Sequence, residues 1–136
     1  LTYYAEKGSG AFLNEQAISI SDCSQLESAN VLATKLALEA RHWRLPLPVG
    51  LQRWHKPSLA YRMALVAQGE FDAMITLRDT WDWDICAGAL IAAEAGAQVS
   101  DKSGAPLIFN SLKVKSSGVL AASPDLHRQL IKSLNF

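Results

Sequence analysis

The sequence predicts an α/β fold in which a mostly parallel sheet carries helices on both faces and follows a short antiparallel ribbon. After residue 30, helical segments alternate with short apolar strand-like segments, a pattern typical of parallel sheets. The residues before 22 instead form extended runs around a Gly-rich turn. The chain has 136 residues, 49% of them hydrophobic, which is enough for one buried core. We therefore expect a ribbon over residues 1–22 and an α/β domain over residues 23–136.

The ribbon is predicted from strands over residues 1–6 and 11–20, joined through Lys7-Gly8-Ser9-Gly10. Glycine adopts the left-handed backbone of tight turns at little cost, so this segment favours a hairpin. A second turn is expected at residues 14–16. An unpaired ribbon edge favours pairing with another chain. We therefore expect a homo-oligomer.

The segments that follow are assigned in order along the chain. Residues 31–34 predict a strand, residues 36–42 a short helix and residues 44–50 an irregular link, because Pro46 and Pro48 exclude a regular helix. The later elements are a helix over 58–68 capped by Ser58, a strand over 71–77, a helix over 84–95, strands over 98–100 and 118–121, and a helix from 124 or 125 to 134 after Ser123.

Asp84 is the first candidate functional residue. It precedes a run of almost entirely apolar residues, 85–93, so its carboxylate is placed to cap that helix and to keep one oxygen free for a cation. Capping alone is the more common role of such an aspartate. Trp81 and Trp83 are expected to pack on opposite sides of the segment and to hold Asp84 by burial. Asp82 is a possible second ligand, although a solvent-facing or turn-capping role is favoured.

Residues 83–96 carry Trp-Asp, an Ala-Gly step and Glu-Ala-Gly ten residues after the aspartate. This pattern resembles the C-terminal signature of the inositol monophosphatase-like phosphatases. Residues 4–14 and 58–73 resemble two further segments of that family in the same order. The resemblance implies a lithium-sensitive, Mg²⁺-dependent phosphomonoesterase. It also implies that Asp84 is both a metal ligand and the catalytic residue that orients water, and that Ser58 and Ala60 bind the substrate.

The chain departs from the family pattern at three positions. Pro57 and Ala97 stand where glycine is usual, and Leu77 stands where inositol-specific members are expected to carry an acidic side chain. Leu77 disfavours strict inositol specificity. The expected substrate is a small phosphorylated metabolite, either an inositol phosphate, a sugar bisphosphate or a 3'(2'),5'-bisphosphate nucleotide.

The resemblance covers only the C-terminal half of a family member. The Glu-Glu pair and the Asp-Pro-Leu/Ile-Asp-Gly-Thr segment that supply most metal ligands in the family are absent from these 136 residues. We therefore expect the isolated chain to be inactive, and the ribbon to belong to the N-terminal sheet of a complete member. The alternative is a non-catalytic truncated domain that acts as a dimeric or metabolite-binding module.

Charge and composition argue against several other classes. Thirteen basic and thirteen acidic residues cancel and do not gather into a basic stretch, so neither a nucleic acid polymer nor a membrane is expected as partner. Two cysteines, Cys23 and Cys86, favour a reducing cytoplasm, although a disulfide between them stays open. The three histidines lack zinc-type spacing. Among them, His55 is expected at the surface or near an anionic substrate.

Overall fold

The computed structural model describes all of residues 1–136 and contains two sheets. The small sheet has the order β1-β2-β3, and the large sheet has the order β5-β4-β6-β8-β7. The strands are β1 Tyr3–Glu6, β2 Gly10–Leu13, β3 Gln16–Ile18, β4 Asn30–Ala33, β5 Gln52–Trp54, β6 Ala73–Trp81, β7 Gln98–Ser100 and β8 Lys115–Ala122. The helices are α1 Leu59–Ala67, α2 Asp82–Glu94 and α3 Pro124–Ser133, with short 3₁₀ turns η1 Leu26–Ser28, η2 Leu36–Leu38 and η3 Ala40–His42.

The large sheet is mixed, with one strand opposed to the other four. β4 pairs in parallel with β5 and β6, while β8 pairs antiparallel with both β6 and β7. The predicted α/β class is therefore confirmed, with β8 as the exception to a mostly parallel sheet. Residues 101–114 connect β7 to β8 without a helix, so the chain returns beside β7 in the opposite direction.

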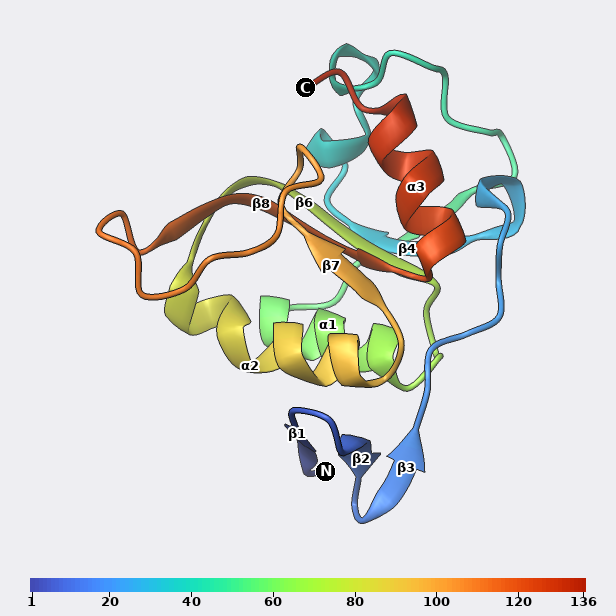
Figure 1. The fold of residues 1–136 in the computed structure, drawn as a ribbon. Coiled ribbons are helices and arrows are strands. Elements are labelled where there is room, and N and C mark those ends of the chain that lie inside the picture. The colour runs from blue at the N-terminus through green and yellow to red at the C-terminus, as the bar shows by residue number, and fades with distance from the viewer.

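Helices cover both faces of the large sheet, as predicted (Figure 1). In the view of Figure 1, α3 lies above the sheet and α1 and α2 lie below it. The large sheet has a hydrophobic core on each face, and alternate residues of β6 belong to different cores. Ile75 packs with Leu126 and Leu130 of α3, whereas Met74 packs with Met63 of α1 and the α2 side chains. This alternation follows from the period of two along a strand.

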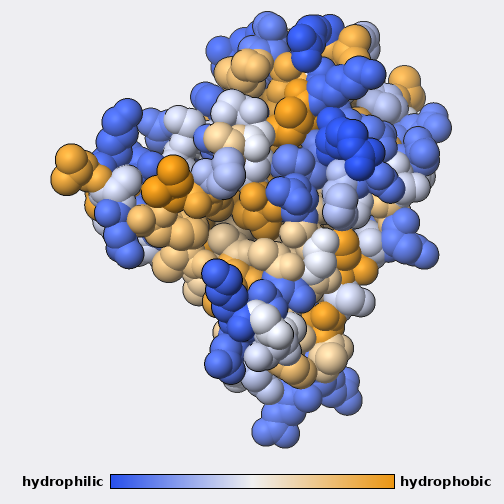
Figure 2. Space-filling model, viewed as in Figure 1, coloured by the Kyte–Doolittle hydropathy of each residue, from blue (hydrophilic) through white to orange (hydrophobic).

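The small sheet confirms the predicted antiparallel ribbon. Tyr3 pairs with Leu13, and Ala11 with Ile18, in successive hairpins. Gly8 and Gly10 have φ values of 83° and 87°, which explains the need for glycine in the first turn. The small sheet projects from the body as a lower lobe in Figure 2, and apolar surface lies between this lobe and the rest of the molecule.

Several element boundaries differ from the sequence predictions. The segment 36–42 forms two 3₁₀ turns rather than a helix, and β5 was not predicted. β6 runs four residues beyond the predicted end at Leu77, because pairing with β8 continues to Trp81. No helix combines the length and the hydropathy that a membrane crossing requires. Cys23 and Cys86 are free thiols, so the disulfide left open above does not form.

Candidate active site

The candidate site lies at the carboxyl ends of neighbouring parallel strands. The chain leaves β4 toward the face that carries α3, where Ala37 of η2 is buried, and it leaves β5 toward the opposite face through α1. Strand ends whose connections diverge in this way leave a crevice that binds ligands in α/β proteins. Thr34 follows β4 and Ser58 follows β5, so both residues lie at this edge.

A cavity of about 380 Å³ contains all three residues that the sequence singled out. Asp84 reaches it from the first turn of α2, and Ser58 and Ala60 reach it from the start of α1. Its remaining lining consists of Leu59, Arg62, Arg78 and Trp83. The fold thus joins two segments separated by more than twenty residues, which the sequence alone could place together only through the family resemblance.

Ser58 caps α1, as predicted. Its side-chain oxygen accepts a hydrogen bond from the backbone N–H of Tyr61 at 3.3 Å. Its φ of 67° is unusual for a residue with a side chain, and such strain often accompanies a binding function. The N–H groups of Leu59 and Ala60 belong to the first turn, where no intrahelical acceptor is available. Ala60 can therefore contact a ligand through its backbone rather than through its methyl group.

Asp84 does not cap α2, which corrects the sequence prediction. The helix begins two residues earlier, at Asp82, and Trp81 occupies the cap position without a side-chain hydrogen bond. Asp84 is the third helical residue, and its exposed carboxylate has no hydrogen-bond partner within the chain. Extension of β6 to Trp81 moves the helix start, because the strand runs directly into α2. The carboxylate therefore keeps both oxygens for a ligand.

The other acidic side chains near this motif have structural roles. Asp82 is buried, and its Oδ2 accepts a hydrogen bond from the backbone N–H of Asn110 at 3.1 Å. This agrees with the capping role that was favoured over metal binding, whereas the solvent-facing alternative is wrong. Glu94 accepts hydrogen bonds from the backbone N–H groups of Gly8 and Gly10. Both carboxylates thus fix loops outside the cavity.

Sequence reasoning missed the two arginines of the cavity. Arg62 projects from α1 and is only 7% exposed, although it forms no ion pair with a carboxylate. Its Nε donates to the carbonyl of Lys56 at 2.5 Å, and one terminal nitrogen lies 3.5 Å from Nδ1 of His55. Burial, and then the charge of Arg78, lower the pKa of the Arg62 guanidinium. A buried cation without a counter-charge is costly, so this position favours an anionic ligand.

A bulge in the large sheet brings Arg78 to the cavity. The register between β6 and β8 shifts between Thr76 and Asp79, where two residues of β6 oppose Gly118 of β8. Bulges of this kind redirect side chains at functional edges of sheets. Gly118 has a φ of 76°, and a Cβ built there would lie 2.5 Å from the carbonyl oxygen of Thr76. Only glycine fits this position, which the sequence pattern did not reveal.

The two tryptophans of the motif do not pack on opposite sides of the segment. Their rings stack on each other, with centroids 4.6 Å apart, and Trp81 and Trp83 remain 39% and 65% exposed. The ammonium of Lys115 lies 4.1 Å from the centre of the Trp81 ring. Asp84 is therefore held by the helix backbone rather than by burial, and Trp83 forms an open wall of the cavity.

The residues of the cavity fit one corner of a magnesium site. Magnesium prefers hard oxygen ligands and keeps several waters, and a carboxylate with both oxygens free suits such a position. Asp84 is the only acidic residue that lines the cavity, and the chain contains no group of three or more His, Cys, Asp or Glu side chains placed to hold a metal ion. A magnesium ion bound by Asp84 would therefore need additional ligands from other residues.

The model of the inositol monophosphatase family matches residues 1–136, the whole of the chain. The chain belongs to the inositol monophosphatase family. A fructose-1,6-bisphosphatase/inositol-1-monophosphatase of Methanothermobacter thermautotrophicus is 35% identical over 135 residues. A bifunctional NADP phosphatase/NAD kinase of Methanococcus maripaludis is 35% identical over 144 residues.

The fold also agrees with solved members of the inositol monophosphatase family. The IMPase of Thermotoga maritima superposes with a TM-score of 0.77 at 29% identity, over 96% of this chain and 49% of that protein. The Methanothermobacter relative is likewise matched over 97% of this chain and 48% of its own length. The chain thus spans about half the length of these relatives, whereas the archaeal NADP phosphatase/NAD kinase is matched over 24% of its length.

Proposed function

We propose that these residues form the Asp84 side of a Mg²⁺-dependent phosphomonoesterase that hydrolyses a small phosphorylated metabolite. The observation that carries the proposal is the single cavity shared by Asp84, Ser58, Arg62 and Arg78. A phosphate entering this cavity meets two guanidinium groups and the N-terminus of α1, all of which favour an anion.

Within the proposed site each residue has a distinct task. Arg62 and Arg78 bind the phosphate oxygens, and the first-turn N–H groups of α1 add neutral donors. Asp84 accepts a hydrogen bond from the attacking water and orients it toward phosphorus. Magnesium, when bound, lowers the pKa of that water and compensates phosphate charge. Trp83 forms one wall of the cavity.

The proposed enzyme needs more acidic groups than this cavity supplies. We therefore propose that the 136 residues are inactive by themselves and act with an N-terminal half or with a second copy of the chain. The exposed part of α2 supports a covering partner, because the apolar side chains of Ala87, Leu90 and Ala93 are exposed there. Apolar side chains that gather at a surface commonly mark an interface with another protein. We further propose a cytoplasmic setting.

Phosphate release tests this proposal directly. The purified 136-residue chain is assayed with inositol 1-phosphate and with 3'-phosphoadenosine 5'-phosphate, in Mg²⁺ and then in EDTA. We expect no release from the chain alone, and Mg²⁺-dependent release from a complete chain that contains it. In the complete chain, Asp84→Asn should lower kcat by roughly 100-fold or more, while Asp125→Asn on α3 serves as the matched control. Equal rates for wild type and Asp84→Asn would show that Asp84 has no role in catalysis.

A non-catalytic module is the second candidate, and one observation favours it. Asp84 is the only carboxylate that lines the cavity, so the chain offers more to an anion than to a metal ion. Such a module would bind a phosphorylated metabolite without turnover. Binding of either substrate with no release under any pairing of chains would favour the module over the enzyme.

A further inference from the structure

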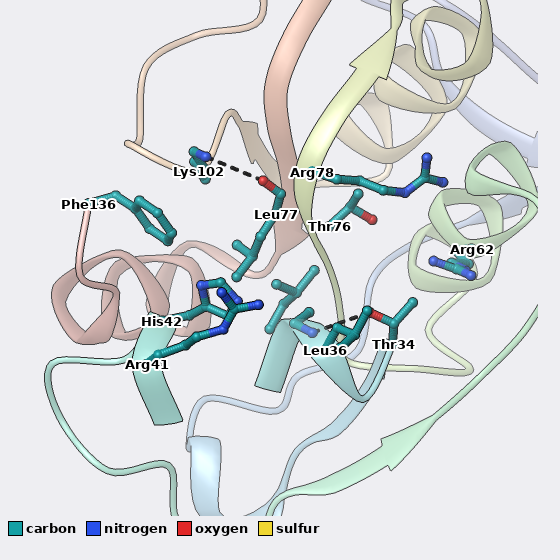
Figure 3. A pocket seen from close by; sticks show the side chains of 12 residues that line it. Thr34, Leu36, Arg41, His42, Arg62, Thr76, Leu77, Arg78, Lys102 and Phe136 are labelled. Atoms are coloured by element: carbon teal, nitrogen blue, oxygen red, sulfur yellow. Dashed lines mark hydrogen bonds between the residues drawn. The ribbon is translucent and has the colours of Figure 1, made fainter. Parts of the chain in front are cut away.

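The three charged side chains of the candidate site are held in place by different means. Arg62 and Arg78 stand between the Asp84 cavity and a second cavity of about 430 Å³ (Figure 3). The Nε of Arg62 is held by the carbonyl of Lys56, and Arg78 is placed by the bulge in β6. The carboxylate of Asp84 makes no hydrogen bond within the chain. Its position therefore depends on the first turn of α2.

The first turn of α2 has no cap from its own side chains. Trp81 stands at the cap position, and its side chain makes no capping hydrogen bond. The first N–H groups of a helix have no acceptor within the helix, and helix ends fray where nothing else satisfies them. A contact from outside the helix must therefore fix the turn that carries Asp84.

Asp82 joins this first turn to the loop before β8 by two hydrogen bonds. Its backbone N–H donates to the carbonyl oxygen of Val114 at 3.0 Å. Its Oδ2 accepts from the backbone N–H of Asn110 at 3.1 Å. The residue is only 8% exposed, and a hydrogen bond to a charged acceptor is stronger than one between neutral groups. The two bonds hold residues 110–114 against the first residue of α2.

The loop that Asp82 contacts is itself fixed. Leu107 and Phe109 pack against the core that α1 and α2 share. Asn110 and Val114 have φ values of 61° and 48°, which is a marked departure for a β-branched residue such as valine. Strained backbone of this kind persists only where the surrounding contacts determine it. The loop is therefore a support against which Asp82 can hold the start of α2.

We propose that Asp82 is a positioning residue for the reaction at Asp84, an inference that rests on the proposed function. Asp82 does not line the cavity. It holds the start of α2, so that the carboxylate of Asp84, two residues later, stays in place at the cavity. A displacement of about 1 Å can cost a reaction about 100-fold in rate. Substrate affinity depends instead on Arg62, Arg78 and the start of α1.

Asp72 offers a matched control at the opposite end of β6. It precedes the strand by one residue, as Asp82 follows it by one. Its N–H donates to the carbonyl of Asn30 at 2.9 Å, and its Oδ2 accepts from the N–H of Asn30 at 2.7 Å. Its Oδ1 also accepts from the hydroxyl of Ser21. Asp72 thus makes the same two kinds of bond as Asp82 but supports no part of α2.

Steady-state kinetics of a complete chain that contains these residues test the inference. Asp82→Ala should lower kcat by roughly tenfold or more and change KM by less than about twofold. Asp82→Asn keeps an oxygen acceptor for Asn110 and should recover most of the rate. Asp72→Ala should lower the melting temperature at least as much as Asp82→Ala and leave kcat unchanged. If alanine at position 82 prevents folding, Asp82→Ser, whose shorter side chain falls short of Asn110, carries the same expectation.

Amide exchange in the 136-residue chain follows the start of α2 without turnover. By helix geometry, Ile85 and Cys86 carry the first N–H groups that bond within α2. Exchange at both should become faster in Asp82→Ala and stay unchanged in Asp72→Ala. Equal exchange in wild type and Asp82→Ala would overturn the inference, because the two bonds of Asp82 would then not fix the turn.

The kinetic outcomes separate this inference from the proposed function. Asp84-dependent turnover that Asp82→Ala leaves unchanged would keep the proposed phosphatase and overturn the positioning role. An equal loss of kcat in Asp82→Ala and Asp72→Ala would overturn it too, since general destabilisation would then explain both. Absence of any Asp84-dependent turnover would remove the proposed function, and the positioning role with it, even where exchange shows that Asp82 fixes the turn.

Discussion

The carboxylate of Glu94 accepts a hydrogen bond from the backbone N–H of Gly10 at 2.9 Å. It accepts a second bond, at 3.1 Å, from the N–H of Gly8. Glu94 lies at the end of α2, and the two glycines lie at the first turn of the small sheet. One side chain thus ties the two parts of the molecule together across more than eighty residues of sequence.

Replacement of Glu94 by Gln should loosen the small sheet without unfolding the body. The hydrogen bonds from Gly10 and Gly8 lower the pKa of the Glu94 carboxyl, so the ionised form is the better acceptor. Amide exchange at Gly8 and Gly10 should become faster in Glu94→Gln, whereas Glu15→Gln in the exposed second turn should have no effect. Unchanged exchange at both glycines would contradict the assigned role.

The same contact has a defined pH dependence. The pKa of Glu94 is lower in the folded chain than in the unfolded chain, where it is about 4.3. Its stabilisation is therefore complete above the unfolded pKa and is lost as the pH falls through the folded pKa. Wild type should show faster exchange at Gly10 in that acidic range. Glu94→Gln should show the fast exchange at every pH, after correction for intrinsic rates.

His127 should make stability depend on pH in a higher range. It is buried on α3, its Nε2 lies 2.6 Å from the hydroxyl of Ser100, and burial lowers its pKa. The unfolded chain binds a proton below about pH 6.5 while the folded chain resists it. The free energy of unfolding should therefore decrease as the pH falls from about 6.5 to the folded pKa. His127→Asn should flatten this slope in urea titrations, and an unaltered slope would assign it to other groups.

Gly118→Ala should be strongly destabilising because two effects combine there. The φ of 76° disfavours a side chain, and the new Cβ would lie 2.5 Å from the carbonyl oxygen of Thr76. We expect a loss of roughly 3 kcal/mol. Gly8→Ala is the matched control, since its φ is 83° but nothing lies within 4 Å of its Cβ, and it should cost about 1 kcal/mol. Equal costs would exclude the close contact as a cause.

Two substitutions at Ser58 distinguish the effect of backbone strain from the effect of helix capping. Ser58→Ala removes the oxygen that accepts from Tyr61 but keeps a side chain at a φ of 67°. Ser58→Gly also removes the oxygen but tolerates that backbone. Alanine should therefore destabilise α1 by about 1 kcal/mol more than glycine. Thermal unfolding of both variants measures the difference, and a more stable alanine variant would rule out backbone strain at this position.

Local sequence predicted those elements whose signals are themselves local. The turn glycines predicted the ribbon, and Ser58 and Ser123 predicted the starts of α1 and α3. The start of α2 was misplaced, because pairing with β8 extends β6 to Trp81 and the helix follows without a cap side chain. The short strand β5 was missed for the same reason: it is defined by pairing with β4 rather than by its own pattern.

By itself, the sequence determined the α/β class and the ribbon, and its resemblance to a phosphatase family indicated Asp84, Ser58 and Ala60 as candidate site residues. Only the tertiary structure decided that Arg62 and Arg78 stand between two cavities. Arg62 lies on α1 among apolar residues that belong to the core, and Arg78 reaches the site through a bulge opposite Gly118. Neither position carries a local sequence signal, because the burial of Arg62 and the bulge at Arg78 arise only when distant strands and helices meet.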